Sequence, residues 1–165
     1  MGDPFEALGL PARFDLSAEE VTRAWRLRAA GLHPDRQGGA GADGEIMRRA
    51  AELNEAKRAL EDPERRAEAL LRRLGGPSAS EEKGLPEGTL VEFMEAREGL
   101  EEARASGDGE GVERWRAWAE ERKRAHVRSV GELIGKGELR EARVEMNGWR
   151  YTERMLEQID EVREG

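Results

Sequence analysis

The tripeptide His33-Pro34-Asp35 is the feature of this sequence whose residue types and spacing could carry chemistry. Proline has a fixed φ and no N–H, so it ends the preceding helix and would hold the imidazole and the carboxylate at an exposed corner. Residues in such loops are often the ones that contact partners. The motif alone is weak, because a proline after a helix and an aspartate in a loop are both common.

The other polar residues do not form a second reactive site. No combination of nucleophile, base and orienting group can be assembled, so we do not expect an enzyme. Cysteine is absent, which excludes disulfides, cysteine zinc sites and direct cysteine ligation of an iron–sulfur cluster. We therefore expect no metal and no cofactor. His126 lies among charged residues of a helical pattern and is interpreted as a surface or satisfied histidine.

The composition favours an all-α protein. Charged residues make up 39% of the 165 residues and aromatic residues only 5%, which suits helices with i,i+4 ion pairs better than a β-sandwich. The net charge of −8 disfavours a nucleic-acid partner, whose phosphates are bound by clustered cations. No apolar run reaches the length of a membrane span, and the first residues lack a signal-peptide pattern. We expect a cytoplasmic protein that binds neither nucleic acid nor a membrane.

Four helices are expected before residue 75, where two glycines and a proline end the last one. Ser17 and Glu20 form a capping box at the start of the second helix. The glycine-rich stretch 36–44 is predicted to be a loop, because it has too little apolar surface to pack. Periodicity and breakers place the four helices at residues 4–10, 18–32, 46–60 and 64–74.

Three longer amphipathic helices are expected after residue 75, at residues 87–105, 110–135 and 138–163. Their short glycine-containing breaks make neighbouring helices antiparallel and predict a three-helix bundle. Trp115, Trp118 and Trp149 are expected to be mainly core residues. The domains are therefore residues 1–75 and 89–165, with a linker at 76–88 that could be flexible or packed into an interface shared by the two domains.

The order, lengths and loop position of the first four helices resemble those of the J-domain family. The C-terminal part and several motifs resemble the HscB branch of that family. The segments that carry the resemblance are Phe5-Glu6-Ala7-Leu8-Gly9-Leu10-Pro11-Ala12-Arg13-Phe14, Leu53-Asn54-Glu55-Ala56, Asp62-Pro63, Arg66-Ala67-Glu68-Ala69-Leu70-Leu71 and Glu95-Ala96-Arg97-Glu98-Gly99-Leu100. The implied fold is an N-terminal J-domain, a helical hairpin with short flanking helices, and a C-terminal three-helix client-binding bundle.

The resemblance implies a co-chaperone that stimulates the ATPase of a DnaK/HscA-class chaperone and delivers a client to it. The implied chaperone contacts are His33, Pro34, Asp35, Arg23, Arg26 and Arg36. Asp35 would pair with a cation of the chaperone and favour its hydrolysing state through differential binding. The arginines would guide docking on an acidic surface.

The second helix departs from the family pattern in two ways. Residues 29–32 are Ala-Ala-Gly-Leu where the family carries more cations, which predicts weaker electrostatic docking. Arg28 takes a position where the family generally buries a leucine, so either its stem lies over the apolar surface with the guanidinium in water or the helix rotates slightly.

The resemblance also implies a surface of the second domain that binds the iron–sulfur scaffold protein. Its residues would be Leu90, Val91, Met94, Glu95, Glu98 and Tyr151. Spacing alone favours another interpretation, in which Leu90 and Met94 are core residues of the bundle. The resemblance instead implies exposure of Leu90, Val91 and Tyr151.

Two alternative functions stay open at this point. The chain could be a generic J-domain protein that delivers other clients in protein folding. It could also be a helical interaction module in which the tripeptide has no function.

Overall fold

The computed structural model describes residues 2–32 and 41–163. These residues form seven α-helices and no strand, as the composition predicted. The chain divides into two compact units, Met1–Gly75 and Gly76–Gly165. None of the helices in the described ranges is long and apolar enough to cross a membrane.

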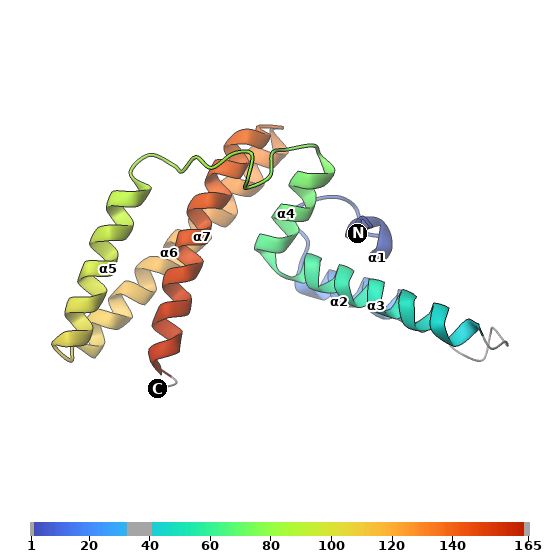
Figure 1. The fold of residues 1–165 in the computed structure, drawn as a ribbon, viewed down its shortest axis with the longest axis horizontal. Helices are drawn as coiled ribbons and strands as arrows, with labels where there is room; N and C mark the ends of the chain where they lie inside the picture. Colours follow the sequence, from blue (N-terminus) through green and yellow to red (C-terminus); the bar gives the residue numbers. More distant parts are fainter. Residues whose placement is uncertain (1, 33–40, 164–165) are drawn as a thin grey trace. The chain divides into compact units, whose positions relative to one another are not determined.

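The first unit contains α1 (Pro4–Leu8), α2 (Ala18–Ala30), α3 (Ala42–Glu61) and α4 (Pro63–Arg73), and α2 lies beside α3 as a helical hairpin (Figure 1). The capping box of α2 is present, because the Ser17 hydroxyl accepts from the Glu20 amide at 3.1 Å and the Glu20 carboxylate accepts from the Ser17 amide at 2.7 Å. Asp62 ends α3 and also caps α4, where its side chain accepts from the Arg65 amide at 2.9 Å.

The helix boundaries around the glycine-rich stretch differ from the sequence prediction. Helix α3 begins at Ala42, so the prediction of a loop as far as residue 44 was wrong at its end. Acidic residues in the first turn of α3, Asp43 and Glu45, favour a helix start there through the helix dipole. Apolar periodicity begins only at Ile46 and therefore missed that turn. Helix α2 ends at Ala30 with Gly31 as its cap.

The core of the first unit is formed by side chains from all four helices and the α1–α2 loop. The buried apolar residues are Phe5, Leu8, Leu16, Val21, Ala56, Leu60, Ala67, Leu70 and Leu71. Arg66 is buried among them, and its guanidinium donates to the carbonyl oxygens of Phe14 and Leu60, each at 2.7 Å. These two hydrogen bonds connect the α1–α2 loop to the C-terminal end of α3.

Arg28 lies on the surface of α2 and extends over α1. A Cβ added to Gly9 would come 2.3 Å from the Nη2 atom of Arg28, so the guanidinium lies directly over this glycine. Gly9 has φ of 66°, a conformation that glycine adopts without strain. The Arg28 side chain is exposed, and its guanidinium lies over the C-terminal end of α1.

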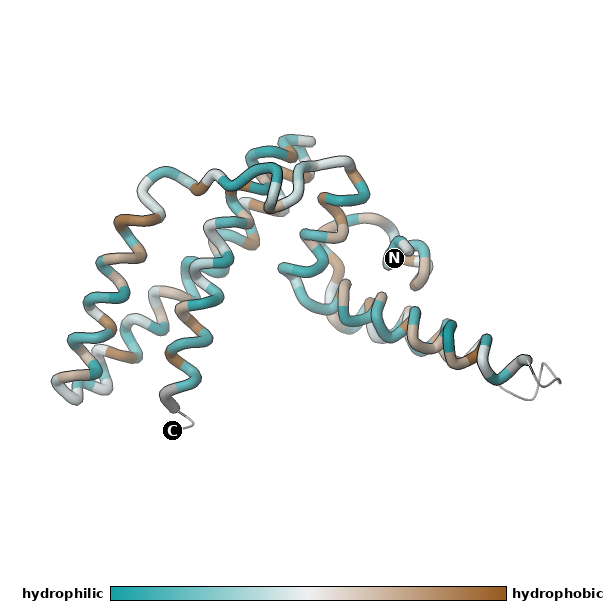
Figure 2. The backbone as a smooth tube through the Cα atoms, viewed as in Figure 1, coloured by the Kyte–Doolittle hydropathy of each residue, from teal (hydrophilic) through white to brown (hydrophobic). Residues whose placement is uncertain are grey.

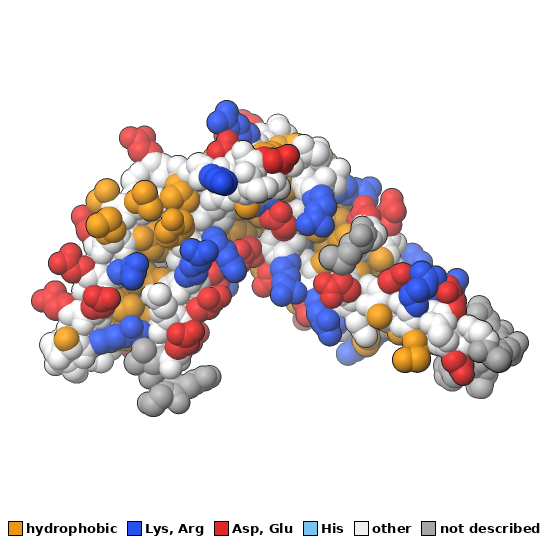
Figure 3. Space-filling view, in the orientation of Figure 1, with side chains coloured by type: hydrophobic (Ala, Val, Ile, Leu, Met, Phe, Trp, Pro, Cys, Tyr) orange, Lys and Arg blue, Asp and Glu red, His pale blue; other side chains and the backbone are white. Residues whose placement is uncertain are grey.

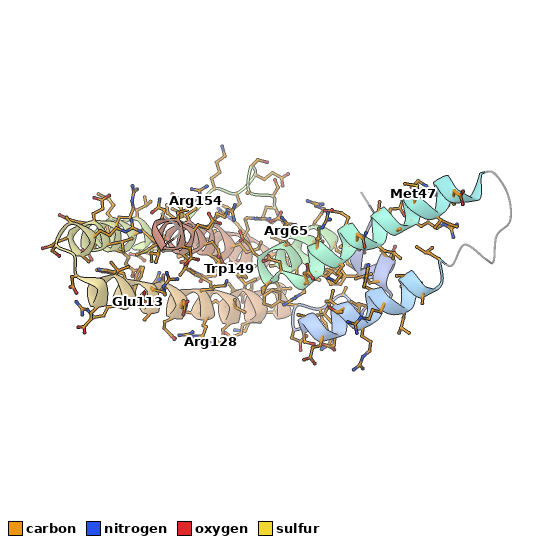
Figure 4. All side chains as sticks on the ribbon, turned by 90° about the horizontal axis from the view of Figure 1, so that it is seen from below. Met47, Arg65, Glu113, Arg128, Trp149 and Arg154 are labelled. Carbon is orange, nitrogen blue, oxygen red and sulfur yellow. The ribbon has the colours of Figure 1, made fainter. Side chains whose placement is uncertain are left out.

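The second unit contains α5 (Thr89–Ala105), α6 (Gly109–Gly135) and α7 (Leu139–Arg163). Helices α6 and α7 form a long antiparallel hairpin, α5 packs along part of it, and α6 lies behind α5 and α7 in Figure 1. Figure 2 shows hydrophobic positions alternating with hydrophilic ones along each of these helices. Trp149 is fully buried between α6 and α7 (Figure 4), whereas Trp115 and Trp118 are partly buried.

His126 is a buried member of the α6–α7 interface. Its Nδ1 atom lies 2.8 Å from Oε1 of Glu145, and its Nε2 atom lies 3.1 Å from Oγ1 of Thr152. Both ring nitrogens therefore have a polar partner on α7. The interpretation of this residue as a satisfied histidine agrees with these contacts.

Residues 77–88, which we call the pre-α5 segment, pack against α7 within the second unit. The Asn147 side chain donates to the carbonyl oxygens of Glu82 and Gly84, at 3.0 and 2.9 Å. Arg143 Nε donates to the Pro77 carbonyl oxygen at 2.9 Å. These contacts make the pre-α5 segment part of the second unit.

Candidate functional site

The exposed arginines of α2 belong to the helix that precedes the tripeptide in the sequence. Arg23 and Arg26 are both exposed on this helix, and within residues 2–32 and 41–163 neither has an ion-pair partner. They border a shallow surface depression together with Ala18, Glu19 and Thr22. Two free guanidinium groups on one helix face suit an acidic partner surface. His33, Pro34, Asp35 and Arg36 lie outside the described residues.

Two exposed apolar residues of the first unit were not singled out from the sequence. Leu27 is 72% exposed on α2, and Met47 is 73% exposed on α3 (Figure 4). Leu27 borders a groove between α1 and α2 that Leu8, Leu10 and Ala24 also line. Leu27 lies outside the helical repeat formed by Val21, Ala24 and Trp25. This departure from the repeat could have identified Leu27 as an exposed residue.

An apolar surface lies on the N-terminal half of α5. Leu90, Val91 and Met94 are 55%, 61% and 70% exposed, whereas Phe93 between them is 4% exposed. The interpretation of Leu90 and Met94 as core residues, which spacing alone favoured, was therefore wrong. Phe93 fills the space toward α6 and α7, and only the neighbouring face of α5 is left without a covering helix. Figure 3 shows the hydrophobic side chains that gather over this half of α5.

Tyr151 continues this surface on α7. Its ring centroid lies 5.7 Å from that of Phe93, so the half-buried tyrosine contacts the core on the side where α5 meets α7. Arg154 also lies against the tyrosine, with Cζ 5.9 Å from the ring centroid. In Figure 4, Arg154 lies on the face opposite Glu113 and Arg128 of α6. Tyr151 of α7 packs against Phe93, the buried residue that lies between the exposed Val91 and Met94 of α5. We refer to Leu90, Val91, Met94, Glu95, Glu98 and Tyr151 as the α5–α7 patch.

The acidic members of the α5–α7 patch are free to accept hydrogen bonds. Glu95 and Glu98 are exposed, and no cation within the described part of the chain pairs with either of them. Glu92, one turn away, is instead paired with Arg122 of α6 at 2.7 Å. The patch thus combines apolar side chains with available carboxylates, which suits a partner surface that carries both apolar groups and cations.

The contact between the pre-α5 segment and α7 was not foreseen from the sequence. Asn147 and Gly148 lie in the middle of α7, and a Cβ added to Gly148 would come 3.0 Å from Cδ of Pro86. The signal was present, because Asn-Gly is a poor helix dipeptide and is more typical of a turn. Its position within a strong apolar repeat indicated a packing role.

Comparisons with known proteins cover both units. Residues 85–160 match the family described as the HSCB C-terminal oligomerisation domain, and residues 3–69 match the DnaJ domain family. A co-chaperone protein HscB homolog of Bordetella parapertussis is 34% identical over 161 residues, which are 95% of this chain and 94% of the relative. The chain spans nearly all of that relative.

Two solved structures have a similar fold. The chaperone HscB from Vibrio cholerae gives a TM-score of 0.84 at 24% identity, covering 99% of this chain and 98% of the other. The human co-chaperone protein HscB gives a TM-score of 0.85 at 18% identity, covering 99% and 83%. At these identities the similarity shows the fold alone.

Proposed function

Since this chain belongs to the HscB family of co-chaperones, we propose that it stimulates the ATPase of a DnaK/HscA-class chaperone and delivers the iron–sulfur scaffold protein to it. The first unit would contact the chaperone through His33, Pro34 and Asp35, together with Arg23, Arg26 and Arg36. The second unit would bind the scaffold protein through the α5–α7 patch. The observation that carries the proposal is the exposure of Leu90, Val91 and Met94 around a buried Phe93.

The exposed arginines of α2 support the chaperone part of this proposal. Their guanidinium groups have no ion-pair partner in the described ranges, so docking would not first have to break an internal ion pair. Asp35 would pair with a chaperone cation, and the chaperone itself would carry out the hydrolysis. The co-chaperone acts by binding one chaperone state better than another, which shifts the equilibrium between them.

The arrangement of the α5–α7 patch supports the scaffold part. Exposed apolar side chains cost free energy in water, about 25 cal/mol for each Å² left uncovered. A partner that covers Leu90 and Met94 recovers this free energy, and Glu95 and Glu98 at the edge would select partners with cations. Tyr151 adds a ring with a hydroxyl group, which suits an interface that is apolar at its centre and wet at its edge.

ATP turnover by the partner chaperone tests the first part. Wild type should stimulate turnover, His33→Gln should lose the stimulation, and Arg23→Ala/Arg26→Ala should weaken it most at low salt. The matched control is Arg65→Ala/Arg72→Ala, which removes two exposed arginines of α4 and should leave the stimulation unchanged; Figure 4 labels Arg65. Equal stimulation by wild type and His33→Gln, or none by either, would contradict the proposal.

Calorimetric titration with the scaffold protein tests the second part. Leu90→Ala/Met94→Ala should weaken binding by about tenfold or more, because two exposed apolar contacts are lost. Leu27→Ala/Met47→Ala is the matched control, since it removes the same residue types at similar exposure from the first unit. If wild type does not bind the scaffold protein, the chain serves a different client.

A further inference from the structure

Gly148 is a position where α7 packs closely against the pre-α5 segment. A Cβ built there would lie 3.0 and 3.1 Å from Cδ and Cγ of Pro86, and 3.4 Å from Cε1 of His126. The distances to Pro86 are tighter than ordinary van der Waals contact, so a methyl group would require Pro86 or α7 to shift by a few tenths of an ångström. The glycine costs helix stability in the middle of α7, and it lets the ring of Pro86 pack directly against the helix backbone.

Asn147, the neighbour of Gly148, holds the same segment by hydrogen bonds. Its side-chain amide donates to the carbonyl oxygens of Glu82 and Gly84. Glu82 in turn accepts from the Gly84 amide at 2.8 Å and from Arg140 Nε at 2.5 Å. The segment therefore follows α7 along two turns, and Pro86 lies at its last contact before α5.

Pro86 is also connected to the first residue of α5. Its carbonyl oxygen accepts from the Thr89 hydroxyl at 2.7 Å and from the Thr89 amide at 3.2 Å. Thr89 is 1% exposed and is the first residue of α5. Because it is hydrogen-bonded to Pro86, the position of Pro86 determines the position of the first turn of α5. One turn later Phe93 contacts Tyr151, which lies three residues after Gly148 on the same side of α7.

We propose that Gly148 and Asn147 are positioning residues for the α5–α7 patch. Through Pro86 and Thr89 they set where Leu90 and Met94 lie relative to Tyr151, although neither needs to contact the partner. This inference rests on the proposed function, because it assigns a role within the same binding surface. It predicts that a methyl group at residue 148 weakens scaffold binding by displacing Pro86 and the start of α5, without itself contacting the partner.

The experiment compares Gly148→Ala with wild type in calorimetric titrations with the cluster-free scaffold protein. The expected result is binding weaker by about fivefold or more, in keeping with the usual coupling between residues in contact. Amide hydrogen exchange should become faster in residues 82–92, while α6 stays as protected as in wild type. Gly135→Ala is the control, because nothing lies within 4 Å of a Cβ at Gly135, and it should bind like wild type.

A second variant separates positioning from loss of folding. Pro86→Ala removes the ring atoms that a Cβ at residue 148 would meet, so Gly148→Ala/Pro86→Ala should bind more tightly than Gly148→Ala alone. Gly148→Ala that binds like wild type would overturn the inference, as would a loss of binding that Pro86→Ala does not recover. Failure of wild type to bind the scaffold protein would instead overturn the proposed function.

Discussion

The guanidinium of Arg66 donates one hydrogen bond to the Phe14 carbonyl oxygen and a second to the Leu60 carbonyl oxygen, each at 2.7 Å. Burial lowers the pKa of Arg66. The nearby carboxylates of Asp62, Asp15 and Glu20 raise this pKa and so offset part of the effect of burial. A cation with this little access to water is retained only if its hydrogen bonds are made. The contact therefore stabilises the loop between α1 and α2.

Replacing Arg66 by methionine tests this contact. Arg66→Met keeps most of the stem but leaves two carbonyl oxygens without their donor, so the first unit should lose about 2–3 kcal/mol of its free energy of unfolding. The loss is measured by urea unfolding, with amide hydrogen exchange in α1–α4 used to monitor the first unit. Arg72→Met, at an exposed position of α4, should cost little, and equal losses for the two variants would show that the hydrogen bonds of Arg66 do not stabilise the fold.

The His126 contacts predict a cost for losing a hydroxyl group in the second unit. Thr152→Val removes the Oγ1 atom that lies 3.1 Å from Nε2 of His126 and leaves a buried ring nitrogen without a partner. We expect a loss of about 1–3 kcal/mol in the free energy of unfolding. Thr22→Val, on the half-exposed face of α2, should stay within about 0.5 kcal/mol of wild type. If Thr152→Val unfolds at the same temperature as wild type, the expectation is wrong.

The capping box of α2 predicts a dependence of stability on pH. Hydrogen bonding from Ser17, with a smaller effect of Arg13, lowers the pKa of Glu20 below its ordinary value of 4.5. A lowered pKa contributes stability that is fully present above the ordinary value and is lost as the pH falls through the folded-state value. Glutamine keeps an acceptor for the Ser17 amide but does not titrate.

Thermal unfolding of wild type and Glu20→Gln, between about pH 7 and pH 3, checks this dependence. The difference in melting temperature should favour wild type near neutral pH and shrink as the pH falls below the ordinary value of 4.5. Glu19→Gln, on the same turn of α2 and without a hydrogen bond to the cap, is the control. A constant difference across the range would mean that the carboxylate charge does not contribute.

Gly9 and Arg28 predict a coupled effect in the first unit. Gly9→Ala introduces a side chain at φ of 66° and displaces the Arg28 guanidinium, so it should cost about 1–2 kcal/mol. Because Arg28 is a flexible surface side chain, Gly9→Ala/Arg28→Ala should recover only a minor part of this loss, and the backbone strain should remain. A double-mutant cycle from urea unfolding gives the coupling free energy. Full recovery in the double mutant would assign the cost to the arginine contact and not to the backbone.

Helix positions could be predicted from this sequence because caps and breakers are local signals. Ser17 with Glu20, and Asp62 before Pro63, mark helix ends through hydrogen bonds and sterics that involve only a few residues. The exposure of Leu90 and Met94 could not be derived in the same way. It depends on how many helices surround α5, and spacing along one helix does not contain that information. The resemblance to a family supplied it for Leu90.

The contact at Gly148 shows the same limit at a finer scale. The Asn-Gly dipeptide signals an unusual helix position, but the sequence does not say which segment approaches it. Pro86 lies far away along the chain and has no pattern that pairs it with α7. Contacts between a helix and an irregular segment depend on the path of the backbone, which local propensities do not determine.

Asp62 both ends α3 and caps α4, so the corner between these helices contains no spare residue. An inserted residue would have to move one helix relative to the other or abandon a cap, and either change would disturb the buried contacts of Arg66. The breaks at residues 106–108 and 136–138 lie in exposed turns, and each places three residues between one helix and the next. Natural variation in chain length, and the insertion of tags or reporter peptides, should therefore be tolerated at those turns and not at the α3–α4 corner.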